Sequence, residues 1–207
     1  MVTIIPSILT TDPLELRQML EKCEGVVDRV HIDIIDGKYA NNKTIEPSSL
    51  ERIETSLNID FHLMVENPID WVEKCVRSGA DRIIAQVEKM NDQLEFFGKV
   101  QTAGVGVGFA LDLGTPIGII DESLLTELDV VLVMNVKAGF GGQQFEPQSL
   151  DTINKLKEIK SKDSSPFAIC ADGGINSDNI NTVLQAGADE IVMGRTFFEN
   201  IEKWLTK

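Results

Sequence analysis

The chain has 207 residues, of which 43% are apolar and 25% charged, and it carries 33 acidic against 19 basic side chains for a formal net charge of −14. This length and apolar content suffice for one domain with a full hydrophobic core, while the negative charge disfavours nucleic acid and anionic membranes as partners. An anionic small molecule stays open as a ligand, because a few backbone N–H groups and one cation set the local field of a cleft.

The cysteines and the N-terminus favour a cytoplasmic protein. Cys23, Cys75 and Cys170 are an odd number without CxxC spacing, which is typical of buried free thiols in a reducing compartment. The N-terminal segment lacks the basic stretch and long apolar run of a signal peptide. No run of about 18 uncharged apolar residues is present to span a membrane.

Short apolar runs rich in β-branched residues alternate with amphipathic helical stretches along the whole chain, and we count eight of each. Such alternation predicts βαβ units with a parallel sheet covered by helices. Eight units of about 25 residues fill the chain, which favours a closed barrel over an open doubly wound sheet. We therefore expect an α/β fold, a (β/α)8 TIM barrel, as a single domain over residues 1–207. The expected strands are 3–8, 28–34, 59–65, 82–87, 105–111, 129–135, 167–171 and 189–193.

Local signals mark the expected ends of the helices. Thr11-Asp12-Pro13 predicts a helix start with a capping side chain and a proline in the first turn. Gly79 and Gly187 are expected just after helices, where a left-handed residue ends the helix. The related sequences Ser-Gly-Ala-Asp at 78–81 and Ala-Gly-Ala-Asp at 186–189 indicate one helix-to-strand turn used twice.

Titratable residues gather at the C-terminal ends of the expected strands, where barrels of this kind build their active sites. His31 and Asp33 are two apart in an extended segment, so both side chains leave the same face of the strand. His62 lies near the end of the neighbouring strand, and Asp172 lies at the end of the seventh. A lone buried histidine is more often a hydrogen-bonded core residue. Two histidines and two aspartates together, however, suit one divalent Zn²⁺, Fe²⁺ or Mn²⁺ ion.

Glycine-rich stretches follow the last three expected strands. Glycine lets backbone N–H groups approach phosphate oxygens closely, and barrels commonly hold phosphate on these loops. Arg195 would add a charge-assisted contact, the alternative being a surface arginine above a helix start. We expect a phosphate to be bound by Gly139, Gly141, Gly142, Gly173, Gly174, Gly194 and Arg195.

Five ordered motifs together resemble the ribulose-phosphate 3-epimerase family, over about Ile4 to Phe198. They are Pro6-Ser7-Ile8-Leu9, His31-Ile32-Asp33-Ile34-Ile35-Asp36-Gly37, Asp60-Phe61-His62-Leu63-Met64-Val65, Gly139-Phe140-Gly141-Gly142-Gln143 and Asp172-Gly173-Gly174-Ile175. The resemblance implies that a divalent metal is held by the residues His31, Asp33, His62 and Asp172. It also places Ser7, His62, Met64 and Met134 beside the substrate, although a methionine at a strand end is more often core packing.

The resemblance implies an isomerase of carbohydrate metabolism that epimerises C3 of a ketose phosphate, converting D-ribulose 5-phosphate to D-xylulose 5-phosphate in the pentose phosphate pathway. Inverting a carbon without a redox cofactor needs an acid and a base on opposite faces of a planar enediolate. Asp33 and Asp172, from distant strands, meet that demand, and which of them removes the proton stays open. The metal would act as a Lewis acid on the ketone, and the loop 139–143 would be a lid.

The chain departs from the family where Met, His, His, Pro and Ser are usual, at Ile35, Lys38, Gln86, Ala138 and Arg195. None of these removes an expected metal ligand or acid–base residue, but several lie on the substrate side. A ketose 6-phosphate such as allulose 6-phosphate is therefore an alternative substrate.

Two further hypotheses stay open. A lyase of the related decarboxylase and aldolase barrels would use Gly194-Arg195 on phosphate, but its Asp-x-Lys-x-x-Asp array is not matched by Asp33, Asp36 and Lys38. A non-catalytic binder of a phosphorylated ligand would not need the metal set. Asp36 either orients a metal ligand or shapes the Asp-Gly turn. Association into a homo-oligomer is also open, because no interface is evident in the sequence.

Overall fold

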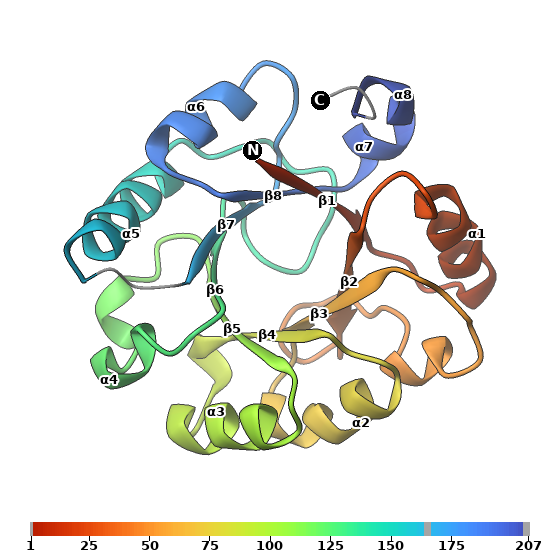
Figure 1. The fold of residues 1–207 in the computed structure, drawn as a ribbon, viewed down its shortest axis with the longest axis horizontal. Helices are drawn as coiled ribbons and strands as arrows, with labels where there is room; N and C mark the ends of the chain where they lie inside the picture. The colour runs from red at the N-terminus through yellow and green to blue at the C-terminus, as the bar shows by residue number, and fades with distance from the viewer. Residues whose placement is uncertain (1, 164–166, 205–207) are drawn as a thin grey trace.

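A computed structural model describes residues 2–163 and 167–204 of the chain. Eight parallel strands close into a barrel in chain order, and helices surround it (Figure 1). The strands are β1 (Thr3–Ile8), β2 (Arg29–Ile35), β3 (Asn58–Met64), β4 (Arg82–Gln86), β5 (Gly106–Leu111), β6 (Val130–Met134), β7 (Ala168–Asp172) and β8 (Glu190–Met193). Every expected strand is present with its ends at most one residue from the predicted ones. The predicted single (β/α)8 barrel is confirmed.

The helices are α1 (Pro13–Cys23), α2 (Val72–Arg77), α3 (Gln93–Thr102), α4 (Glu122–Leu125), α5 (Ser149–Asp163), α6 (Ile180–Ala186), α7 (Arg195–Glu199) and α8 (Ile201–Trp204). Helix α1 begins as predicted, since the Asp12 carboxylate accepts a hydrogen bond from the Leu14 N–H. Gly79 and Gly187 both have positive φ after their helices. Of the helices in the described part of the chain, none has the length and apolarity needed to cross a membrane.

The expectation of a helix after every strand was wrong between β2 and β3. Residues 36–57 are all described, and the helical element among them is the short 3-10 turn Pro47–Leu50. Asn41-Asn42, Pro47 and Ser48-Ser49 favour turns and interrupt an amphipathic period. The segment instead reaches the loop after β6, where the Asn42 side-chain amide donates to the Gly139 carbonyl over 2.8 Å.

Side chains alternate between the inside of the barrel and the layer under the helices, because successive residues of a strand point to opposite faces. Ile5, Ile84, Leu132 and Val192 pack in one buried cluster inside the barrel, while residues of the opposite parity pack under the helices. Strands that are buried on both faces explain the continuous apolar runs of the sequence. The three cysteines are free and buried, as expected.

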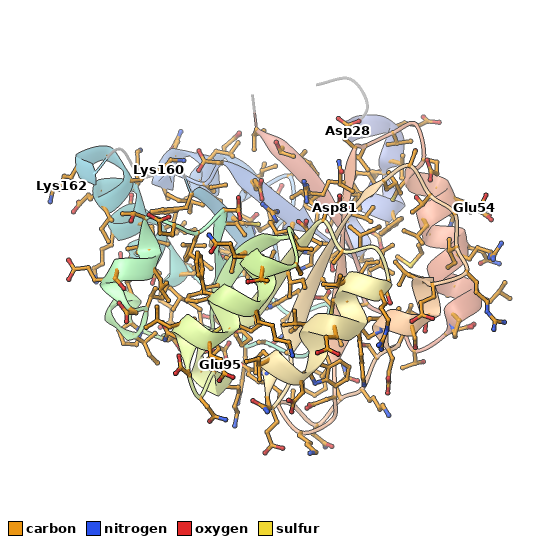
Figure 2. The ribbon with its side chains drawn as sticks, turned by 60° about the horizontal axis from the view of Figure 1, so that its bottom comes forward. Asp28, Glu54, Asp81, Glu95, Lys160 and Lys162 are labelled. Carbon is orange, nitrogen blue, oxygen red and sulfur yellow. The ribbon has the colours of Figure 1, made fainter. Side chains whose placement is uncertain are left out.

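Aspartates before even-numbered strands fasten the N-terminal end of the barrel. The carboxylates of Asp81, Asp129 and Asp189 accept hydrogen bonds over 2.7–2.8 Å from the backbone N–H groups of Ile59, Val107 and Ile169 in β3, β5 and β7. The two related Ala-Asp turns of the sequence therefore make the same contact, in which the aspartate accepts a hydrogen bond from a backbone N–H of the preceding strand. Figure 2 shows Asp28 and Asp81 at the end of the barrel where α5 terminates at Lys160 and Lys162, with Glu95 of α3 at the opposite end.

Gly108 lies inside the barrel where neighbouring side chains fill the space that a side chain would need, and its replacement tests this packing. A Cβ atom there would lie 2.5 Å from Val130 Cγ1 and 2.8 Å from Ile84 Cγ1. We expect Gly108→Ala to lower the free energy of unfolding in urea by about 1–3 kcal/mol through overpacking. Gly98→Ala in α3, where nothing lies within 4 Å, is the matched control and should be neutral or stabilising by up to about 1 kcal/mol. Equal stability of both variants would contradict this packing.

Candidate active site

Two histidines and two aspartates meet inside the C-terminal end of the barrel. His31 and Asp33 lie on the inner face of β2, His62 pairs with Asp33 in the register of β2 and β3, and Asp172 is the last residue of β7. One ligand atom of each lies within 4.8 Å of all the others. The parallel register therefore gathers residues from three strands around one point.

The spacing of these atoms fits a divalent cation. Asp33 Oδ1 is 3.1 Å from His62 Nδ1 and 3.6 Å from His31 Nε2, and Asp172 Oδ2 is 3.8 Å and 3.9 Å from the same two nitrogens. Tetrahedral ligands about 2.0–2.2 Å from Zn²⁺ are about 3.4 Å apart. His31 is fully buried and neither ring nitrogen has a hydrogen-bond partner among the described residues. A buried imidazole without a partner in the chain fits the role of a metal ligand.

Burial and mutual charge push the pKa values of the two aspartates apart. Burial opposes ionisation of Asp33, but the hydrogen bond with His62 and the charges of His31 and His62 outweigh it and hold the Asp33 pKa well below its usual range. Burial and the nearby charge of Asp33 raise the pKa of Asp172 to about 7, although His31 acts against this rise. Without a cation, the pair thus favours one carboxylate and one carboxylic acid at neutral pH.

The pKa values of the two histidines are shifted in opposite directions. Burial alone would lower the pKa of His31, but the carboxylates of Asp33 and Asp172 raise it above its ordinary value. Burial lowers the pKa of His62, and the neighbouring charge of His31 adds to this effect despite the contact with Asp33. His62 is therefore the imidazole better suited to remain neutral and to bind a metal.

A cavity of about 800 Å³ opens above this cluster. Ser7 lies at its floor, where its hydroxyl donates a 2.6 Å hydrogen bond to Asp33 Oδ2. His62, expected beside the substrate, is fully buried and does not line this cavity. The other residues expected to contact substrate or phosphate all line it: Ser7, Met64, Met134, Gly139, Gly141, Gly142, Gly173, Gly174, Gly194 and Arg195.

Glycine is required where the loop after β7 passes the loop after β6. Gly174 has a φ of 66°, and a Cβ atom there would lie 2.4 Å from the backbone nitrogen of Phe145. Arg195, in the first turn of α7, places its guanidinium 3.2 Å from where a Cβ of Gly142 would be. Within the described chain no carboxylate forms a salt bridge with Arg195. The cavity is thus lined by the exposed guanidinium group of Arg195 beside a closely packed segment of backbone.

Asp112, which the sequence analysis did not single out, ties three loops together at the C-terminal end of the barrel. The Tyr39 hydroxyl donates to Asp112 Oδ2 over 3.3 Å, and Asp112 Oδ1 accepts from the Ala138 N–H over 2.9 Å. Asp112 directly follows β5, so its place after an apolar run was the available signal. The contact joins the loops after β2, β5 and β6.

Asp36 shapes the turn after β2. Its carboxylate accepts hydrogen bonds from the backbone N–H groups of Lys38, Tyr39 and Glu66 over 2.8–2.9 Å. Of its two open roles, this geometry supports the turn. Lys38 itself is largely exposed and pairs with Glu66 over 3.1 Å, outside the residues that line the cavity.

The comparisons with solved structures bear on the fold. A mutant tryptophan synthase alpha-subunit from Pyrococcus furiosus superposes with a TM-score of 0.68 at 15% identity, covering 97% of this chain and 90% of that one. N-(5'-phosphoribosyl)anthranilate isomerase from the same organism gives a TM-score of 0.60 at 14% identity, covering 95% and 89%. At such low identity these similarities show the shared barrel fold alone.

Sequence comparison identifies the family. A sequence model described as "Ribulose-phosphate 3 epimerase family" matches residues 3–198. Ribulose-phosphate 3-epimerase from Bacillus subtilis is 33% identical over 202 residues, covering 96% of this chain and 93% of the relative. The enzyme of that name from Treponema pallidum is 35% identical over 199 residues, covering 95% and 91%. The resemblance found in the motifs is confirmed: the chain belongs to the ribulose-phosphate 3-epimerase family and is an enzyme of the isomerase class.

Proposed function

We propose that the protein epimerises C3 of a ketose phosphate in a metal-dependent reaction, with D-ribulose 5-phosphate and D-xylulose 5-phosphate as substrate and product. The observation that carries the proposal is that Asp33 and Asp172, with opposite pKa shifts, face one cavity beside a four-ligand cluster. The names of the relatives supply the sugar. Membership of the family supports the type of reaction.

The two aspartates act as base and acid. Asp33 on β2 and Asp172 on β7 approach the cavity from different sides of the barrel. One carboxylate removes the C3 proton and the other delivers a proton to the opposite face of the planar intermediate, which inverts the carbon. Environments that separate the pKa values of two carboxyl groups are the usual source of such divided roles. The Ser7 hydroxyl fixes the orientation of Asp33 through its hydrogen bond.

The ligand set His31, Asp33, His62 and Asp172 would hold one Zn²⁺, Fe²⁺ or Mn²⁺ ion. Such an ion, when bound, supplies Lewis-acid polarisation of the ketone and compensates the negative charge of the intermediate. The chain's own contribution is to fix four ligands at the spacing described above. Met64 and Met134 provide an apolar wall of the cavity next to them.

The phosphate of the substrate is held by the glycine loops after β6, β7 and β8. Gly173, Gly174 and Gly194 bring backbone close to the cavity, and Arg195 supplies the charge-assisted contact. The loop 139–143 covers the sugar, and Phe140 at its tip is half exposed. A lid in this place would keep water from the intermediate.

A ketose 6-phosphate is the second candidate substrate, because Arg195 stands where the family usually carries serine and the 800 Å³ cavity admits a longer sugar. The lyase hypothesis is less well supported, since Lys38 pairs with Glu66 outside the cavity. The retained four-ligand cluster speaks against a binder without catalysis.

Removal of one acid–base group tests the mechanism. In D₂O, the metal-loaded protein should incorporate deuterium at C3 of D-ribulose 5-phosphate and form xylulose 5-phosphate, followed by NMR. Asp172→Asn should reduce the formation of xylulose 5-phosphate by at least about 100-fold, because inversion needs both carboxylates and an amide can neither remove nor deliver the proton. Asp92→Asn, which exchanges the cap of α3 for another good cap, is the matched control and should retain activity. Full turnover by Asp172→Asn would refute the two-aspartate mechanism.

Arg195→Ser tests the phosphate contact. Loss of a charge-assisted hydrogen bond of about 1.5–3 kcal/mol should lower kcat/KM by about 10- to 100-fold, mainly through a higher KM. Lys38→Ser removes a cation that lies outside the cavity and should leave both constants unchanged. Steady-state assays with the pentose 5-phosphate and hexose 6-phosphate sugars compare the substrates. An equal effect of the two variants would place the phosphate elsewhere.

Metal binding should depend on pH in a defined direction. A metal needs ionised carboxylates, whereas Asp172 in the metal-free protein has its pKa raised to about 7. Between about pH 6 and pH 8, Zn²⁺ or Mn²⁺ affinity should therefore rise with pH, as ever fewer molecules must release this proton on binding. Calorimetric titration in buffers of different ionisation enthalpy measures the released protons. Asp172→Asn should weaken and flatten the dependence, and an affinity independent of pH in the parent would contradict it.

A further inference from the structure

Gln86 is the side chain that contacts the far side of the His62 ring. It ends β4 on the inner face of the barrel, is fully buried, and its amide lies 3.1 Å from His62 Nε2. The other ring nitrogen, Nδ1, lies 3.1 Å from Asp33 Oδ1 and 3.8 Å from Asp172 Oδ2. The two nitrogens of His62 are thus divided between the four-ligand cluster and Gln86.

The surroundings of Gln86 fix the direction of its amide. With the amide oxygen toward His62, the nitrogen donates to the Ala110 carbonyl over 3.2 Å and to Glu88 Oε2 over 3.0 Å. The opposite orientation would set the amide oxygen against these two acceptors, so the hydrogen-bond network assigns the first. Glu88 is itself held in place, because its Oε1 accepts from the Asp112 N–H over 2.8 Å.

An amide oxygen accepts hydrogen bonds and cannot donate them. Facing Nε2, it favours the neutral His62 ring that carries its hydrogen on this nitrogen and has a lone pair on Nδ1. Before a cation binds, the Asp33 carboxylate, 3.1 Å from Nδ1, is the stronger acceptor and draws the hydrogen to Nδ1. The Gln86 oxygen reduces this preference by offering an acceptor at Nε2, whereas without it the ring keeps its hydrogen on Nδ1. That tautomer cannot bind a metal through Nδ1.

We propose that Gln86 is a positioning residue that keeps the hydrogen of His62 on Nε2 and thereby presents the Nδ1 lone pair to a divalent cation between Asp33 and Asp172. The inference rests on the proposed metal centre but not on the sugar or the reaction. Residues that orient a metal ligand in this way typically contribute about 10- to 100-fold to metal affinity. The family usually carries histidine here, a ring that can accept or donate, whereas the glutamine of this chain is anchored in one direction by Glu88.

The test uses the full-length protein labelled with ¹⁵N in histidine. The chain has two histidines, so a long-range ¹H–¹⁵N spectrum of the Zn²⁺-loaded protein contains two rings, assigned with a His31→Asn variant. We expect His62 of the parent to show hydrogen on Nε2, with a resonance shifted downfield by the hydrogen bond to Gln86. Gln86→Met, of similar volume but without the amide, should leave this hydrogen without an acceptor, shift its resonance upfield and speed its exchange with water. Zn²⁺ affinity, measured by competition with a chelator, should fall by about 10- to 100-fold.

Two further variants separate this role from packing. Gln86→His, whose ring nitrogen can accept the same hydrogen bond, should restore the downfield Nε2–H resonance and most of the affinity. Gln93→Met removes a glutamine that makes two hydrogen bonds on the outer surface and should change neither measurement. Urea unfolding confirms that each variant is folded, and Gln86→Leu replaces Gln86→Met if the latter is not.

Hydrogen on Nδ1 of His62 in the Zn²⁺-loaded parent would overturn the inference. An unchanged Nε2–H resonance and unchanged affinity in the folded Gln86→Met or Gln86→Leu variant would do so as well. Absence of isotope exchange in a protein that shows the expected tautomer and affinities would refute the proposed function and leave the role of Gln86 intact.

Discussion

The burial of Asp33 and Asp172 close together governs the properties of the C-terminal end of the barrel. Both face the two imidazoles at distances under 4 Å, with little contact with bulk water. Two carboxylates in such a place cannot both remain charged unless a positive group joins them. The raised pKa of Asp172, about 7, shows one way to reduce this charge, namely protonation near neutral pH. The proposed divalent cation would take the place of that proton.

The opposite end of the barrel handles buried charge in another way. Asp60 is fully buried, and it pairs with Arg29 and with Arg82, which also pairs with Glu190. Here each carboxylate has an arginine of the same chain, so compensation is complete and permanent. In the described part of the chain, neither Asp33 nor Asp172 forms a salt bridge with an arginine or a lysine. At the C-terminal end the charge of the carboxylates can be compensated by a proton or a cation, whereas at the N-terminal end arginines of the chain compensate it. This difference agrees with the division of barrels into a functional face and a stabilising face.

The sequence predicted those features that depend on periodicity and not those that depend on contacts between loops. Because side chains alternate between the two faces of a strand, the sequence correctly predicted that His31 and Asp33 lie together inside the barrel. The eight apolar runs correctly predicted the positions of the strands. The bond from Tyr39 to Asp112 joins residues 73 apart in the chain, and no local pattern encodes which loops meet. Whether a residue near a strand end lines the cavity or is buried beneath it was also hard to predict, because this depends on contacts between strands and loops. His62 lies near the end of β3 and Gln86 ends β4, yet both are fully buried and neither lines the cavity.

The register of the strands is what makes the cluster possible. Asp33 pairs with His62 across β2 and β3, and Met134 pairs with Asp172 across β6 and β7. Because side chains alternate along a strand, a slip of β3 by one residue would turn His62 out under the helices and bring Phe61 or Leu63 inside. Phe61 and Leu63 are fully buried in the layer under the helices. Such a slip would therefore also disrupt the packing of the hydrophobic core, at a large cost in stability. The packing under the helices, far from any substrate, therefore determines that the four candidate ligands meet.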